Sequence, residues 1–309
     1  MSTAIQPLVV PRGSVLTLAR DYAELVKLRV TTLIIMTAWC GYYFGALRSG
    51  ISSFSWSLFH ALLGIGLVSG GAAALNEVME WDTDGRMRRT AQRPIPAGRF
   101  GFVHATLVGV LMTFGGALYL GLALNPLTAW MALATSAVYL GAYTPLKKVH
   151  PICTFVGAFP GAMPGVLGWT AARGHFDWGA LVMFAIVFFW QFPHFYSIAW
   201  LYGQDYEDGG VRMLPVVEPD GKSTSRQILL YSTALIPVSL LPTLLAMSGR
   251  LYFAGALVLG IILLYFGWRL ASLKVATSNA RSKQRARQLL QATVIYLPLL
   301  FALMMLNKR

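Results

Sequence analysis

The chain has 309 residues, of which 56% are hydrophobic and only 12% are charged. A soluble globular protein has about 25% charged residues, so this composition is that of a polytopic membrane protein and excludes a disordered chain or a secreted disulfide scaffold. The two cysteines, Cys40 and Cys153, lie in apolar segments. They are too few for a disulfide framework or a thiolate metal cage, so we expect them to pack as small apolar side chains.

Apolar segments long enough to cross a bilayer, which takes roughly 20 residues each, occur nine times in the chain. They cover residues 30–48, 56–76, 102–122, 127–145, 152–172, 179–200, 228–247, 251–269 and 288–306. The pattern predicts an all-α, polytopic membrane protein with one transmembrane domain over residues 29–309, preceded by a cytoplasmic segment at residues 1–28. No apolar core precedes Val30, so the first span is expected to act as the insertion signal.

The charged residues set the predicted orientation. With the N-terminus in the cytoplasm, only five of the 25 Lys and Arg residues fall on the opposite side: Arg48, Arg173, Arg250, Lys308 and Arg309. Cytoplasmic loops carry an excess of Lys and Arg, so this asymmetry explains the net charge of +13 without any binding of nucleic acid. Every Asp and Glu except Asp177 also falls on the cytoplasmic side, which the rule for basic residues does not explain.

Two polar loops stand out, at residues 76–94 and 204–215. They follow the second and the sixth predicted spans, so they share one face of the membrane in either orientation. In the first loop Asn76, Glu80 and Asp84 are four residues apart, which places them on one face of a continuing helix. A carboxamide and carboxylates suit Mg²⁺, which proteins bind through one or two carboxylates together with substrate phosphates.

Basic residues on the same face complete the pattern. Arg86, Arg88, Arg89 and Arg93 follow the acids directly, and Lys147 and Lys148 come after the fourth span. A carboxylate and a phosphate at 4 Å repel by roughly 4 kcal/mol at an effective dielectric constant near 20, so a diphosphate beside these acids needs a bridging divalent cation. The loops therefore favour a magnesium-bridged phosphate or diphosphate, although an ordinary solvated face is the alternative.

Two features within the predicted spans allow a structural and a functional interpretation. His194 is polar and lies inside the sixth span, where it either serves a function or hydrogen-bonds a neighbouring helix. Gly157, Gly161 and Gly165 recur every four residues in the fifth span. Such a glycine stripe predicts close packing of helices.

The sequence resembles the UbiA-type intramembrane prenyltransferases through Asn76-x3-Glu80-x3-Asp84, followed by Arg89-Thr90-x2-Arg93-Pro94. Further segments resemble the protohaem IX farnesyltransferase (haem O synthase) family within it: Asp21-Tyr22-x2-Leu25-x-Lys27, Tyr143-Thr144-Pro145-x-Lys147, Pro160-Gly161-Ala162-Met163-Pro164, Trp190-Gln191-Phe192-Pro193-His194-Phe195, and Asp205-Tyr206 with Met213-Leu214-Pro215-Val216. Glu80 stands where many relatives have Asp, and Gln204 where a second acid is common.

The resemblance implies nine helices bundled around a central cavity, with the diphosphate site at the cytoplasmic end. It implies Mg²⁺ as cofactor, farnesyl diphosphate and haem B as substrates from the lipid bilayer, and haem O as product. A haem A synthase or terminal oxidase assembly would be a partner. The implied catalytic and metal-binding residues are Asn76, Glu80, Asp84 and Asp205, with Asp208 or Glu207 as further metal ligands. The implied diphosphate-binding residues are Arg89, Arg93, Lys147 and Lys148, and His194 is the implied haem-binding residue.

Three rival functions stay open at this point. One is prenylation of another acceptor, such as an aromatic acid, a quinone precursor or a chlorophyllide. Another is secondary transport, although transporters place their coupling sites near the middle of the bilayer rather than at helix ends. The third is a haem chaperone that binds haem without reaction. The lack of an Arg-rich and Ser-rich N-terminal extension favours a bacterial inner membrane over an organellar one.

Overall fold

The computed structural model describes residues 15–273 and 275–309. Arg12 and Lys274, two basic residues on the predicted cytoplasmic side, lie outside the described residues, as does part of the predicted segment 1–28. Within the described ranges the chain is almost entirely helical, without a β-strand, and one isolated bridge joins Ser248 to Lys308. The predicted all-α membrane fold is confirmed.

The helices follow one another along the chain with short connections. They are α1 (Val15–Leu25), α2 (Leu28–Arg48), α3 (Trp56–Met79), α4 (Trp81–Arg86), α5 (Phe102–Ala123), α6 (Pro126–Ala137), the π-helix η1 (Val138–Tyr143), α7 (Thr144–Leu146), α8 (Cys153–Arg173), α9 (Trp178–Leu201), α10 (Gly203–Asp208), α11 (Leu214–Val217), α12 (Lys222–Leu244), α13 (Arg250–Ala271) and α14 (Ala280–Leu306).

Several long helices begin at residues that satisfy their first free backbone N–H groups. Ser55 accepts a hydrogen bond from the N–H of Leu58 at the start of α3. Asn125 caps α6, where Pro126 occupies the first turn, and Asp177 caps α9 by accepting from two backbone N–H groups. Such caps stabilise a helix by about 0.5–2 kcal/mol each and fix where it starts.

Seven of the described helices are long and apolar enough to cross a membrane: α2, α3, α5, α9, α12, α13 and α14. The other two predicted spans coincide with α8 and with the rod made of α6, η1 and α7. A π-helical turn divides that rod into short pieces, and α8 is rich in glycine and contains Pro160 and Pro164. The multi-span membrane fold is therefore confirmed, and the count of nine stays a prediction for these two segments.

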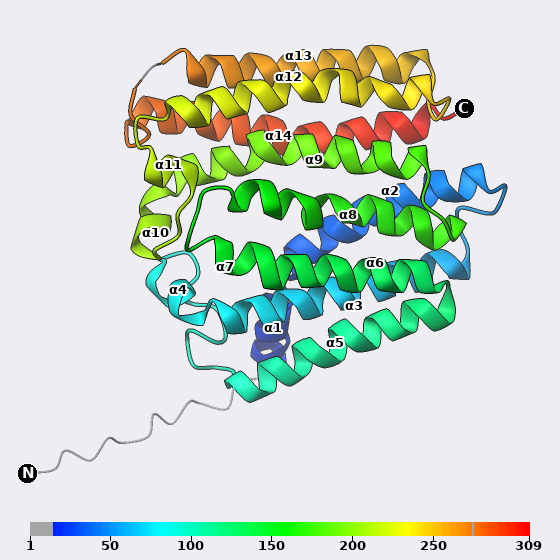
Figure 1. Ribbon diagram of the computed structural model, residues 1–309, viewed down its shortest axis with the longest axis horizontal. Helices are drawn as coiled ribbons and strands as arrows, with labels where there is room; N and C mark the ends of the chain where they lie inside the picture. The colour runs from blue at the N-terminus through cyan, green and yellow to red at the C-terminus, as the bar shows by residue number, and fades with distance from the viewer. Residues whose placement is uncertain (1–14, 274) are drawn as a thin grey trace, which may run out of the picture.

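The long helices lie side by side and form two groups that meet at α8 and α9 (Figure 1). On one side α2, α3 and α6 pack on α8, and α5 packs on α3 and α6. On the other side α12 and α14 pack on α9, and α13 packs on α12 and α14. The short helices α4, α10 and α11 all lie at one end of the bundle (Figure 1). The two polar loops identified in the sequence are therefore at the same end.

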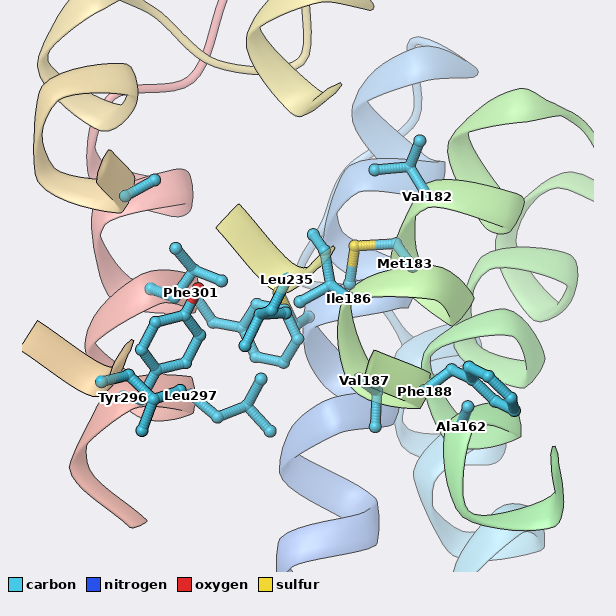
Figure 2. Close-up of a cluster of buried hydrophobic side chains, with 14 of the residues drawn as sticks. Ala162, Val182, Met183, Ile186, Val187, Phe188, Leu235, Tyr296, Leu297 and Phe301 are labelled. Carbon is cyan, nitrogen blue, oxygen red and sulfur yellow. The ribbon is translucent and has the colours of Figure 1, made fainter. Parts of the chain in front are cut away.

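The largest apolar core lies between α8, α9, α12 and α14. Figure 2 shows Met183 and Ile186 of α9 beside Leu235 of α12, with Phe301 of α14 near them, and all four side chains are buried. Cys40 and Cys153 are buried and free, as predicted. This core fixes α9, so the polar loop that follows α9 has a rigid support.

The predicted close packing of α8 is confirmed at its glycines. A β-carbon at Gly161 would overlap with the side-chain amide of Gln191 on α9. A β-carbon at Gly168 would overlap with the carbonyl of Ala38 on α2, and one at Gly41 of α2 would overlap with the carbonyl of Gly165. Glycine is therefore required where α8 touches both of its neighbours.

We expect Gly168→Ala to force α2 and α8 apart and to destabilise the protein by about 1–3 kcal/mol, as overpacking of a tight contact does. Gly115→Ala on α5 is the matched control, because a β-carbon there meets nothing within 4 Å. Thermal unfolding in detergent measures both. Equal midpoints for Gly168→Ala and the wild-type protein would contradict the close approach of these helices.

Candidate functional site

The site begins where α3 leaves the bundle. Glu80 interrupts the helical dihedral angles between α3 and α4, with φ −107° and ψ 10°. The hydrogen-bond ladder nevertheless continues, since Glu80 N donates to Asn76 O at 3.0 Å and Asp84 N to Glu80 O at 2.7 Å. Asn76, Glu80 and Asp84 are therefore stacked along nearly one helical path, as their spacing predicts. Their exposed fractions are only 0%, 5% and 2%.

Asn76 and Glu80 form one hydrogen-bonded unit with α7. Asn76 Nδ2 donates to Glu80 Oε2 and to Thr144 Oγ1, both at 2.9 Å. Lys147 Nζ donates to the two carboxylate oxygens of Glu80 at 2.9 and 3.0 Å. Burial lowers the pKa of Lys147, but the Glu80 carboxylate more than offsets this effect, and the net shift of the pKa is upward. Lys147 is therefore a firmly charged partner of Glu80.

Asp84 has a cation of its own. Arg93 Nη1 donates to Asp84 Oδ2 at 2.5 Å, and the arginine comes from the loop between α4 and α5. Thr90 Oγ1 donates to the backbone carbonyl of Asp84 at 2.8 Å, which fastens the same loop. Within the motif Arg89-Thr90-x2-Arg93, Thr90 therefore holds the loop in place through the backbone of Asp84, and Arg93 supplies the positive charge beside its carboxylate.

Lys27, between α1 and α2, is the third cation of the site. Its Nζ donates to Asn76 Oδ1 at 2.5 Å. Desolvation, together with the nearby charges of Arg93 and Lys147, lowers the pKa of Lys27 to about 7. Its backbone is left-handed, with φ 48° and ψ 51°, an unfavourable conformation for a residue with a side chain. The strained turn directs the amino group of Lys27 to the buried amide of Asn76.

The second polar loop reaches the first through aromatic contacts. The guanidinium of Arg89 lies over the ring of Tyr206 on α10, 4.3 Å from its centroid, and 5.3 Å from the centroid of Tyr202. Gly209 packs so closely on Met87 that a β-carbon would clash with it. The two loops lie at the same end of the bundle, as predicted, and they are in contact there.

Two cavities lie between these loops. The first, of about 90 Å³, is bordered by Lys27, Glu80, Thr83, Asp84, Met87, Arg89, Thr90, Arg93, Tyr143, Lys147, Tyr206, Val211 and Met213. The second, of about 160 Å³, is bordered by Arg89, Tyr143, Thr154, Gly157, Phe195, Ile198, Tyr206 and Met213. Arg89, Tyr143, Tyr206 and Met213 border both, so a charged cavity adjoins one with more apolar walls.

Five predicted site residues border neither cavity: Asn76, Lys148, His194, Asp205 and Asp208. Asp205 is half-buried on α10, and Asp208 is exposed and accepts a hydrogen bond from Gln204 at 3.0 Å. Lys148 donates to Asp82 at 3.1 Å, and this hydrogen bond lowers the pKa of Asp82. In the described part of the chain no three Asp, Glu, His or Cys side chains gather as a metal site. The catalytic, metal-binding, diphosphate-binding and haem-binding roles of all the predicted site residues stay predictions.

The residues at the first cavity nevertheless suit a magnesium ion. Glu80 and Asp84 supply two carboxylates that border the cavity, whereas the carboxamide oxygen of Asn76 accepts from Lys27 and Asn76 does not border it. Mg²⁺ is typically bound by one or two carboxylates and completes its shell with phosphate oxygens and water. The donor set therefore fits a magnesium–diphosphate better than a metal ion held by protein ligands alone.

His194 lies on α9, away from the acidic residues. Its Nδ1 is hydrogen-bonded to Thr293 Oγ1 on α14 at 2.9 Å, and its ring stacks on Trp190 with centroids 4.7 Å apart. The predicted contact with a neighbouring helix is therefore present. Phe195 and Ile198 of α9 border the second cavity, whereas the ring of His194 contacts α14 and does not border it.

Sequence reasoning missed several residues of this site. Lys27, Tyr143 and Tyr206 occur in the segments that resemble the family. Nothing in their local pattern predicts that they border a cavity. Glu77 was missed altogether: it is fully buried, and its Oε1 accepts from the backbone N–H of Ile95 at 3.1 Å. Glu77 directly follows the second predicted span and lies in the first polar loop, so nothing in its local pattern predicts a buried acid.

Comparison with known proteins agrees with this geometry. The sequence profile of the UbiA prenyltransferase family matches residues 33–304. The chain is 61% identical over 308 residues to the protoheme IX farnesyltransferase of Koribacter versatilis (strain Ellin345), a match that covers 100% of this chain and 99% of the relative. It is 47% identical to the protoheme IX farnesyltransferase of Solibacter usitatus (strain Ellin6076), over 94% of this chain and 99% of that protein.

Solved structures share the fold at low sequence identity. A digeranylgeranylglyceryl phosphate synthase structure superposes with a TM-score of 0.74 at 15% identity, covering 94% of this chain and 98% of its own. A UbiA homologue from Archaeoglobus fulgidus, bound to GPP and Mg²⁺, gives a TM-score of 0.59 at 15% identity, with 92% of this chain and 99% of that chain covered. This chain belongs to the UbiA prenyltransferase family and is a prenyltransferase of the membrane.

Proposed function

We propose that the protein transfers a farnesyl group from farnesyl diphosphate to a vinyl group of haem B and so produces haem O. The observation that carries the proposal is the first cavity, where Glu80 and Asp84 face Lys147, Arg93 and Arg89. Relatives that share 61% and 47% of the sequence carry the corresponding name, which supports the choice of substrates.

The cations of the cavity supply the driving force for loss of diphosphate. Arg89 and Arg93 present planar guanidinium groups that can hold phosphate oxygens in pairs, and Lys147 adds a compact charge. Mg²⁺, held by Asn76, Glu80 and Asp84, would neutralise the leaving group when bound. Positive groups that are fixed before the reaction stabilise the charge that develops as the allylic C–O bond breaks.

The second cavity suits the apolar part of the prenyl substrate. Phe195, Ile198 and Met213 give it apolar walls directly behind Arg89. We assign this space to the first isoprene units of the farnesyl chain, where water is excluded from the allylic cation. The haem vinyl group attacks that cation, and one water then adds to the resulting carbocation with loss of a proton, which gives the hydroxyethylfarnesyl substituent.

We further propose that His194 binds the haem and that the N-terminus lies on the cytoplasmic side of a bacterial inner membrane. Imidazole is the commonest axial ligand of haem iron, and Thr293 engages only the Nδ1 atom of His194. The charge asymmetry of the loops supports the orientation. Haem A synthase or a terminal oxidase in assembly would then receive the product from the same bilayer.

Purified protein incubated with farnesyl diphosphate, Mg²⁺ and haem B should yield haem O, and chelation with EDTA should stop the reaction. We expect Glu80→Gln and Asp84→Asn to lower kcat by about 10²-fold or more, because each removes one buried carboxylate of the proposed metal site. Haem binding should persist in both variants. Liquid chromatography with mass spectrometry measures the product.

Asp220→Asn is the matched control, because Asp220 is exposed and borders neither cavity. Product formation with Glu80→Gln and Asp84→Asn at the wild-type rate would refute the site. Transfer of farnesyl only to an aromatic acid or a chlorophyllide would refute the acceptor. Substrate flux across vesicles without a prenylated product would favour a transporter instead.

A second prediction separates diphosphate binding from metal binding. Lys147→Gln should lower kcat/KM for farnesyl diphosphate by about tenfold or more, since it removes a charged group worth about 1.5–3 kcal/mol in a hydrogen bond. Lys222→Gln is the control, because Lys222 is an exposed lysine paired with Asp220. Steady-state kinetics with varied farnesyl diphosphate distinguish the two, and equal values for both variants would contradict the role of Lys147.

Cysteine labelling tests the orientation. The two native cysteines are buried, so a cysteine introduced at the exposed positions Glu207 or Ser52 should react first with a membrane-impermeant maleimide. In inverted inner-membrane vesicles we expect Glu207→Cys to be labelled and Ser52→Cys to be protected. The reverse pattern would show that the N-terminus is outside.

A further inference from the structure

Thr293 makes two hydrogen bonds that involve its single hydroxyl group. Its Oγ1 donates to the carbonyl of Leu290 at 2.6 Å, one turn back along α14. The same oxygen is 2.9 Å from Nδ1 of His194 on α9. A hydroxyl has one proton to donate and two lone pairs that accept.

These two contacts determine the proton on the histidine ring. Because the hydroxyl proton of Thr293 points to Leu290, Oγ1 can only accept from His194. Nδ1 of His194 therefore carries a proton, and in the neutral imidazole the other nitrogen, Nε2, carries the free lone pair. A neutral imidazole with a free Nε2 is the form in which histidine binds a metal ion through that atom.

Trp190 holds the same arrangement from a second side. Its Nε1 donates to the backbone carbonyl of Thr293 at 2.8 Å, and its ring stacks on His194 at an angle of 21° between the planes. The imidazole plane is thus fixed by a stacking partner as well as by a hydrogen bond. Metal-binding histidines are commonly oriented by such a hydrogen bond at the nitrogen that does not bind the metal.

We propose that Thr293 is a positioning residue: it holds His194 in the Nδ1-protonated tautomer, so that Nε2 is aimed and free to bind the iron of haem B. The proposal rests on the haem substrate of the proposed function. Thr293 itself touches neither substrate. His194 lies on the same helix as Phe195 and Ile198, which border the second cavity.

The test is titration of purified full-length protein with ferric haem B, followed by absorption and electron paramagnetic resonance spectra. We expect the wild-type protein to show the signature of an axial histidine, and His194→Ala to lose it. Thr293→Val keeps the shape and the backbone carbonyl but removes the acceptor. It should weaken haem binding by about 10–100-fold and shift the spectrum, which is the usual cost of losing such an orienting partner. Thr293→Ser should restore both.

Thr135→Val is the matched control, because Thr135 also bonds a carbonyl one turn back but contacts no histidine. A wild-type spectrum and affinity for Thr293→Val, with the histidine signature lost in His194→Ala, would overturn the role of Thr293 and leave haem ligation by His194 intact. Identical spectra for the wild type and His194→Ala would show that His194 does not bind the haem iron and would overturn the inference. Haem O formation in the same preparations reports separately on the proposed function.

Discussion

Buried carboxylates at the end of a membrane helix need compensating charge, and the organisation of this protein depends on that requirement. Glu80 and Asp84 are almost inaccessible to solvent, and unpaired they would be protonated or would destabilise the fold. Lys147 and Arg93 each contact one of them, and Lys27 contacts the amide of Asn76 between the helices. Because each carboxylate is paired, Lys147 and Arg93 can bind phosphate oxygens in place of carboxylates once a divalent cation takes over the carboxylates, and no buried charge is left unpaired.

The bundle supplies the rigidity that such a site needs. The cations come from three separate parts of the chain, namely the α1–α2 junction, the α4–α5 loop and the residue after α7. Their positions depend on how tightly the helices pack, and glycines in α8 allow the close approach of α2 and α9. Arg89 then joins the two polar loops through the rings of Tyr202 and Tyr206. Packing in the apolar part thus sets the geometry of the charged part.

Much of this arrangement follows from the sequence. Long apolar segments predict the helices, and the spacing of Asn76, Glu80 and Asp84 predicts their common face because local periodicity is enough for both. Contacts between distant segments have no such local signal. The pairing of Lys147 with Glu80 instead of Lys148, and the left-handed turn that aims Lys27, arise only when helices pack. The same limit applies to Asp205. The sequence places it in the second polar loop but does not predict its distance from Asp84.

The central claim is that this acid-and-base cavity directs a farnesyl group onto haem. Mass spectrometry of haems extracted from cells, with and without expression of this protein in a host that makes only haem B, tests it most directly. The account predicts a new haem that is heavier by one farnesyl group and one hydroxyl group, and its disappearance with the Glu80→Gln variant. Extracts that contain haem B alone, with the wild-type protein present and folded in the membrane, would contradict it.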